Sequence, residues 1–136
     1  MADKLKIKAT VDNLKDVSEF IEERMNAKDP SPKTSMQIMV AVEELYVNIA
    51  HYAYDSDGGE AEITVDFDGD DNMIISFADW GKPYDPLARQ DPDVTLGAEE
   101  RQIGGLGVYM VKKSMDKFEY RYEDGKNIST IVKKLP

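Results

Sequence analysis

Glu44, Asn48 and His51 follow one another at i, i+4 and i+7 in an otherwise apolar segment, and their side chains could do chemistry. On a helix this spacing places all three on one stripe. An asparagine oxygen is a hard ligand suited to Mg²⁺, and a carboxylate one turn away can accept a proton from a nucleophile. The same pattern also fits an amphipathic helix whose narrow polar stripe faces water.

A second candidate group is Asp79-Trp80-Gly81, which follows a nearly continuous apolar run. The run predicts a buried strand that delivers Asp79 at its C-terminal end, and Gly81 would let the backbone turn close to a ligand. A carboxylate in that place can accept a hydrogen bond from an exocyclic amine such as that of adenine. A capped turn, in which Asp79 and Gly81 act only on the local backbone, is an equally good interpretation.

A third group is the glycine-rich stretch from Arg101 to Gly107, with glycines at positions 104, 105 and 107. Glycines before a helix let backbone N–H groups approach phosphate oxygens, and the helix N-terminus adds partial positive charge. Arg101 could add a charge-assisted contact to a terminal phosphate. The alternative is a flexible loop followed by a helix start. These glycines do not form a Walker loop, because no Gly-x-x-x-x-Gly-Lys-Ser/Thr occurs.

The elements that must position these groups follow from the apolar periodicity. Alternating apolar residues predict strands at about residues 5–9, 60–68, 73–78, 116–123 and 127–135. Helical spacing predicts helices at about residues 12–26, 32–52 and 108–115. Two of the strand pairs are hairpins. We therefore predict an α/β fold, a two-layer α/β sandwich with a mixed, mostly antiparallel sheet and helices on one face.

Composition limits the classes of function. The 136 residues fit one domain over 1–136, and residues of about 82–103, which have no period, are expected to form a flexible lid. The absence of cysteine excludes disulfides, thiolate metal sites and a cysteine nucleophile. The net charge of −10 argues against nucleic acid as a partner. With no apolar run of membrane-spanning length and no signal-peptide core, we expect a cytoplasmic protein and no membrane partner.

Together, the three groups resemble in order and spacing the motifs of the GHKL (Bergerat-fold) ATP-binding family. The resemblance is to its N box, G1 box and G2 box, in Glu44-x-x-x-Asn48, Asp79-x-Gly81 and Gly105-x-Gly107. Within that family, the sequence is similar to the anti-sigma-factor serine kinases. The similarity lies in residues 79–87 and 104–107, and in Met115-Asp116 after the helix. The resemblance covers about residues 5–135.

This resemblance implies an ATP-binding protein that uses Mg²⁺. It implies that Glu44 is the catalytic base for a serine hydroxyl, that Asn48 coordinates the metal and that Asp79 binds the adenine amine. The implied ATP-binding residues are Asn48, Asp79, Gly81, Arg101, Gly104, Gly105, Leu106 and Gly107. Arg101 would close the lid on the γ-phosphate. In the last strand Asn127-Ile128-Ser129-Thr130 stands where relatives often show Gly-Thr, so the hydroxyl that reaches the nucleotide stays open.

The resemblance also implies partners. A protein of this kind phosphorylates a serine on a STAS-domain anti-anti-sigma protein, binds a sigma factor and commonly forms a homodimer. The alternative is a nucleotide-gated protein-binding module without kinase activity, or one with a non-sigma partner. The catalytic fragment of a histidine kinase is less favoured, because no helix pair with a phosphoacceptor histidine is present. A chaperone-like or topoisomerase-like ATPase is less favoured in so short a chain.

Overall fold

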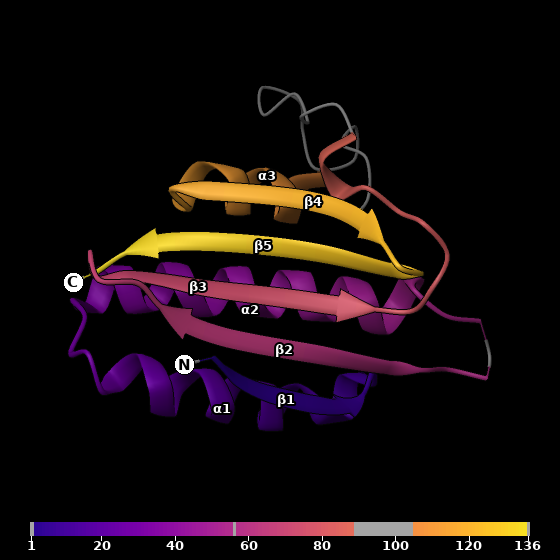
Figure 1. Cartoon of the computed structure of the whole chain (residues 1–136), viewed down its shortest axis with the longest axis horizontal. Coiled ribbons are helices and arrows are strands. Elements are labelled where there is room, and N and C mark those ends of the chain that lie inside the picture. The colour runs from indigo at the N-terminus through magenta and orange to yellow at the C-terminus, as the bar shows by residue number, and fades with distance from the viewer. Residues whose placement is uncertain (1, 56, 89–104, 136) are drawn as a thin grey trace.

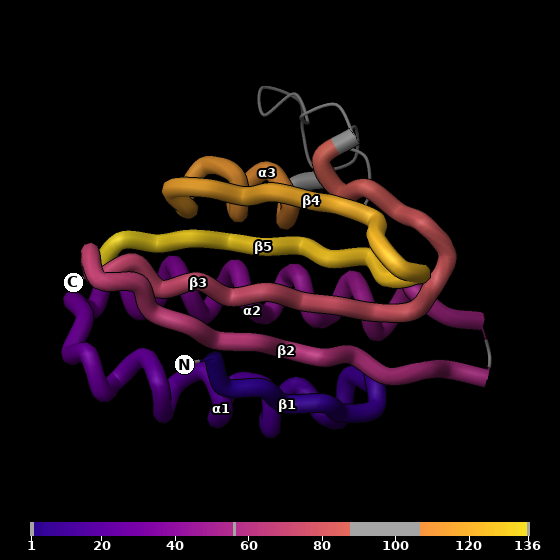
Figure 2. Tube along the Cα trace, in the orientation of Figure 1, coloured from indigo at the N-terminus to yellow at the C-terminus, as the bar shows by residue number. Residues whose placement is uncertain are grey.

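Five strands form one antiparallel sheet in the order β1-β2-β3-β5-β4 (Figure 1). The computed structural model describes residues 2–55, 57–88 and 105–135, and every structural statement below refers to these residues. The strands are β1 (Asp3–Lys8), β2 (Glu60–Phe67), β3 (Asn72–Asp79), β4 (Lys117–Glu123) and β5 (Lys126–Lys134). All four neighbouring pairs run antiparallel. Figure 2 shows β1 at one edge of the sheet and β4 at the other.

Three α-helices cover the same side of this sheet (Figure 1). They are α1 (Leu14–Asn26), α2 (Pro32–Tyr52) and α3 (Gly105–Ser114), and two short 3₁₀ turns lie at Val11–Asn13 and Pro86–Ala88. The predicted two-layer α/β sandwich with helices on one face is therefore confirmed. No helix in the described part of the chain is long and apolar enough to cross a membrane.

The long helix α2 begins where the sequence provides an N-terminal cap. The Ser31 hydroxyl accepts a hydrogen bond from the backbone N–H of Thr34 at 3.2 Å, and Pro32 occupies the first turn, where it sacrifices no helical hydrogen bond. Apolar residues at helical spacing, among them Ile38, Val42 and Ile49, are buried against the sheet. The helix spans 21 residues, about 30 Å, and so runs along the length of the sheet.

The alternation of β3 determines which of its residues face the helices. Met73, Ile75 and Phe77 are each at most 2% exposed, and Asp79 continues the same face at 5% exposed. In the antiparallel pairing of β3 with β5, Asp79 lies directly opposite Asn127. The strand thus carries a carboxylate to the end of the core, and β5 brings an amide beside it.

The core fills the space between the sheet and the helices. Its largest fully buried side chain is Tyr46 of α2, whose hydroxyl donates to the Thr10 carbonyl at 2.6 Å and accepts from the Thr10 N–H at 3.1 Å. Burying an aromatic side chain of this size contributes about 1.5–3 kcal/mol, and the hydrogen bonds satisfy its polar end. This anchor holds α2 to the segment after β1.

Candidate functional site

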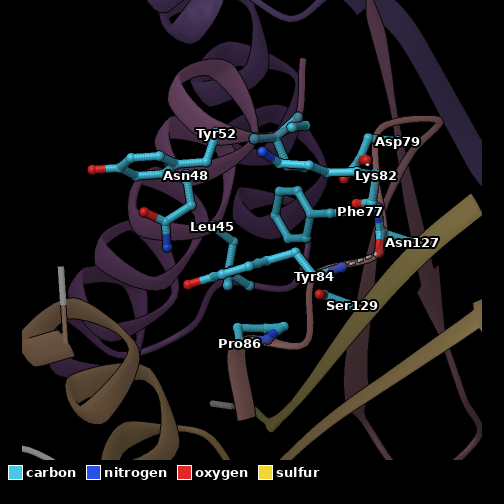
Figure 3. Close-up of a pocket in the computed structure, with 12 residues that line it drawn as sticks. Leu45, Asn48, Tyr52, Phe77, Asp79, Lys82, Tyr84, Pro86, Asn127 and Ser129 are labelled. Atoms are coloured by element: carbon cyan, nitrogen blue, oxygen red, sulfur yellow. Dashed lines mark hydrogen bonds between the residues drawn. The ribbon is translucent and has the colours of Figure 1, made fainter. Parts of the chain in front are cut away.

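A pocket opens between the C-terminal half of α2, the ends of β3 and β5, and the segment that follows β3 (Figure 3). It holds about 470 Å³ of space, part of it open to solvent. Its lining consists of Leu45, Asn48, Ile49, Tyr52, Ala53, Phe77, Asp79, Lys82, Tyr84, Pro86, Asn127 and Ser129. An apolar cavity with a few placed polar groups is typical of small-molecule sites.

Asp79 is the buried carboxylate of this pocket. Its Oδ1 accepts hydrogen bonds from the Gly81 N–H and from the Asn127 amide, both at 2.9 Å. Burial raises the pKa of the Asp79 carboxyl above its ordinary value, and the two hydrogen bonds oppose that rise. Because both donors meet Oδ1, Oδ2 keeps its capacity to accept a hydrogen bond from a ligand.

Gly81 is required by a close backbone approach. A Cβ at this position would lie 2.0 Å from the carbonyl oxygen of Ala53, just after α2. Gly81 therefore takes part in the capped turn with Asp79, and the backbone that it approaches is that of Ala53. The capped turn is therefore present, and Asp79 also lines the pocket.

Asn48 reaches the pocket from α2, on the side opposite Asp79. Figure 3 shows its amide and the Asp79 carboxylate at the two ends of the pocket, with the Phe77 ring between them. Tyr84 extends across the pocket from the Asn127 side toward Asn48. The pocket therefore offers a hydrogen-bond acceptor at one end and a hard amide oxygen at the other.

The other two members of the α2 stripe do not line the pocket. Glu44 is half-buried and lies against α3, where a Cβ on Gly107 would come within 1.9 Å of its Oε2. His51 is exposed, and its ring lies edge-on to the Tyr52 ring with the two ring centroids 5.9 Å apart. The predicted stripe is thus divided between pocket, neighbouring helix and solvent.

The glycines at 105 and 107 form the first turn of α3, which begins three residues earlier than predicted. The N–H groups of a first turn have no partner within their helix and point outward from its N-terminus. α3 is packed beside α2, so this terminus lies next to Glu44. Leu106 belongs to the same turn. Arg101 and Gly104 lie outside the described residues, as does most of the predicted lid.

Sequence reasoning did not assign Asn127, Lys82 or Tyr84 to the site. All three line the pocket, and Asn127 is 5% exposed and bonded to Asp79. The pairing of β3 with β5 brings Asn127 to this place, and these strands are distant in sequence. The feature that identifies Asn127 is a buried polar side chain directly opposite Asp79, and it can be seen only once the strand register is known.

The arrangement can hold an elongated ligand with an amine at one end and an anionic group at the other. The amine would donate to Asp79, and the anionic end would reach the region of Asn48 and the first turn of α3. Backbone N–H groups at a helix N-terminus are suited to phosphate oxygens. Glu44 lies one helical turn before Asn48 and beside that terminus.

Bacterial serine-protein kinases are similar to part of this sequence. The chain is 28% identical over 99 residues to the serine-protein kinase RsbW of Bacillus licheniformis, and 28% identical over 96 residues to RsbW of Listeria monocytogenes. These matches cover 68% and 67% of the chain. The chain spans only 60% of the length of each relative.

Solved structures share the fold. The RsbU and RsbW domains of Rv1364c from Mycobacterium tuberculosis match with a TM-score of 0.68 at 18% identity, over 98% of this chain and 32% of that one. The SiaB–SiaC complex of Pseudomonas aeruginosa matches with a TM-score of 0.62 at 14% identity, over 96% and 88%. At these identities the likeness concerns the fold alone.

The family assignment comes from a match over nearly the whole chain. The family described as "Histidine kinase-like ATPase domain" matches residues 7–133. This range contains α2, the pocket and the start of α3. The chain therefore belongs to the family of histidine kinase-like ATPase domains.

Proposed function

We propose that this protein binds Mg-ATP in the pocket described above and transfers its γ-phosphate to a serine of a partner protein. The observation that carries the proposal is the placement of Asp79 and Asn48 at opposite ends of one pocket, with Glu44 beside the first turn of α3. The family match and the similarity to serine-protein kinases named RsbW support the same activity.

In this proposal the adenine base lies among the apolar side chains of the pocket and donates its amine to Asp79. The triphosphate extends toward Asn48 and meets the N–H groups of Gly105, Leu106 and Gly107. Arg101 and Gly104 complete the phosphate site, as their sequence predicts. A protein of net charge −10 needs such local donors to hold a polyanion.

The side chains present fit a magnesium ion bound together with the nucleotide. Asn48 offers a half-buried amide oxygen inside the pocket, and Mg²⁺ in nucleotide sites takes few protein ligands besides phosphates and water. When bound, the ion would neutralise charge on the phosphates. Asn48 would hold it at the end of the pocket away from Asp79.

Glu44 is the proposed catalytic base. Its carboxylate would take the proton of the serine hydroxyl as the hydroxyl oxygen bonds to the γ-phosphorus and the bond to the β-phosphate oxygen breaks. Phosphoryl transfer depends mainly on positioning and charge neutralisation, which the first turn of α3 beside Glu44 would supply. A base at this place adds the proton acceptor.

The proposed acceptor is a STAS-domain anti-anti-sigma protein, and a sigma factor is the second partner. We further propose a homodimer that acts in the cytoplasm. Incubation with γ-labelled ATP and a STAS-domain anti-anti-sigma protein should label that protein on serine. ATP binding without any transfer would favour the alternative, a nucleotide-gated binding module, and absence of ATP binding would refute both.

Asn48→Ala should weaken ATP binding in the presence of magnesium and leave the weaker, metal-free binding nearly unchanged. The variant removes the amide oxygen but no adenine contact, so the loss should be confined to the magnesium-dependent part, about 10-fold or more. Calorimetric titrations with and without Mg²⁺ measure it. Gln37→Ala, an amide on the same helix about three turns away, is the matched control. Equal ATP affinity in Asn48→Ala and wild type would refute the metal role.

Gly107→Ala should impair transfer with little effect on the Tm. The new methyl group would meet the end of the flexible Glu44 side chain, which can rotate away, so the fold should tolerate it. The displaced base, however, would no longer reach the hydroxyl, and a misplacement of about 1 Å can cost about 100-fold in rate. Transfer rate and thermal unfolding are measured on the same sample. A rate within twofold of wild type would show that the Glu44–Gly107 contact has no part in transfer.

A further inference from the structure

The Asn127 side chain is the centre of a buried hydrogen-bond network at the Asp79 end of the pocket. Its amide nitrogen donates to Asp79 Oδ1 at 2.9 Å, to the Lys82 carbonyl at 2.9 Å and to the Gly81 carbonyl at 3.4 Å. Its oxygen accepts from the Tyr84 N–H at 3.0 Å and from the Tyr120 hydroxyl. Asn127 is 5% exposed, and its bond to Asp79 is buried.

We propose that Asn127 is a positioning residue that sets the base specificity of the pocket, an inference that rests on the proposed ATP site. Its amide holds the Asp79 carboxylate in one orientation, with Oδ1 occupied and Oδ2 kept for the ligand. A 6-amino purine can donate to that oxygen. A 6-oxo purine would present an acceptor to it, and two acceptors facing each other in a buried site repel.

The geometry around Asp79 shows why a second donor matters. The Gly81 N–H alone is one contact to Oδ1, and a carboxylate held by one contact can still turn about its Cβ–Cγ bond. The Asn127 amide adds a second donor from the opposite strand, at the position directly across from Asp79. With both in place, rotation of the carboxylate would break a buried hydrogen bond, which is costly.

The same amide attaches the segment after β3 to the sheet. Bonds to the Lys82 carbonyl and from the Tyr84 N–H fix this segment at the pocket wall, where Lys82 and Tyr84 both line the cavity. A single side chain therefore sets the orientation of Asp79 and the course of the adjacent wall. Only an amide can do so, because donors and an acceptor are both required; an aspartate has no donor and a serine is too short to reach both sides.

Asn127→Ser tests the proposal because the serine side chain is too short to bring a donor to Asp79 and adds no charge beside that carboxylate. We expect ATP affinity to fall about 10- to 100-fold, the range for a charge-assisted hydrogen bond. Purine riboside triphosphate has no 6-amino group, so its affinity should change less than about threefold. The preference for ATP over inosine triphosphate should shrink correspondingly. All three affinities are measured by calorimetric titration.

Two further proteins make the outcome decisive. Asn72→Ser is the matched control, because the Asn72 amide also donates to an aspartate, Asp68 Oδ2 at 2.9 Å, but at the β2–β3 turn. Asn127→Ala replaces the test variant if Asn127→Ser does not fold, and the same loss of preference is expected. Equal losses for all three nucleotides, or no loss in either variant, would overturn the specificity role. Wild-type protein that binds no ATP would refute the proposed function instead.

Discussion

Glu44→Gln is expected to slow phosphoryl transfer about 10²- to 10⁴-fold and to keep the binding of Mg-ATP. Glutamine has nearly the same shape as glutamate but cannot take the proton of a serine hydroxyl, and a positioned base contributes about this factor. Glu44 lies away from the Asp79 end of the pocket, so the variant should keep its ability to bind ATP. The glutamine side chain should still fit against Gly107, so the packing of α2 against α3 should not change.

The neighbouring residue provides the control for this experiment. Glu43 lies on the same helix but is exposed, so Glu43→Gln makes the same chemical change outside the site. Its transfer rate should stay within about twofold of wild type. Single-turnover transfer of γ-label to the acceptor, with saturating ATP, separates chemistry from binding. If Glu44→Gln and Glu43→Gln transferred equally fast, Glu44 would not be the base.

Asp79→Asn is expected to lower ATP affinity about 10- to 100-fold while making the ATP-free protein more stable at neutral pH. The affinity falls because the variant replaces the acceptor for the adenine amine, a charge-assisted hydrogen bond. The stability rises because burial raises the pKa of Asp79, so its ionised form opposes folding. An asparagine at this position keeps an oxygen for the Gly81 N–H and the Asn127 amide.

The sign of the stability effect gives the pH window. A pKa that is higher in the folded than in the unfolded chain favours folding at low pH, where Asp79 is protonated in both states, and this advantage is lost as pH rises through the folded-state pKa. The Tm difference between Asp79→Asn and wild type should therefore be small below about pH 4 and grow toward pH 7. A difference independent of pH would contradict the raised pKa.

Asp85→Asn is the control for both measurements. Asp85 is exposed in the segment after β3, and its Oδ1 caps the Leu87 N–H at 2.8 Å, which an asparagine oxygen can also do. Neither ATP affinity nor the pH profile of the Tm should change. Calorimetry is preferred to intrinsic fluorescence, because the Trp80 ring contacts Lys6 and does not line the pocket. Unchanged ATP affinity in Asp79→Asn would remove the adenine contact from the proposal.

Local signals predicted most of the fold. The range of α2 was predicted as 32–52 and is observed as Pro32–Tyr52, because the Ser31 cap, Pro32 and the apolar spacing all act within a few residues. The start of α3 was predicted too late, at 108. Glycine is a poor helix former, and here the close approach of α2, with Glu44 against Gly107, accompanies a helical turn that propensity disfavours.

The site was predictable to the extent that its residues lie in short motifs. Asn48 and Asp79 were assigned from spacing and strand position, and both line the pocket. Asn127 was not assigned, since its position beside Asp79 depends on the register between β3 and β5. The two residues are 48 positions apart in the sequence. The roles of Arg101 and Gly104 stay predictions from the sequence.

The contact between Glu44 and Gly107 has a consequence for comparing homologues across genomes. Any side chain at position 107 would occupy the space of the glutamate carboxylate, so selection for transfer should preserve glycine there. A lineage that keeps nucleotide binding but abandons catalysis is released from this constraint, and alanine or serine can then accumulate. Under the proposed role of Glu44, the residue at position 107 should therefore separate relatives that transfer phosphate from relatives that only bind nucleotide.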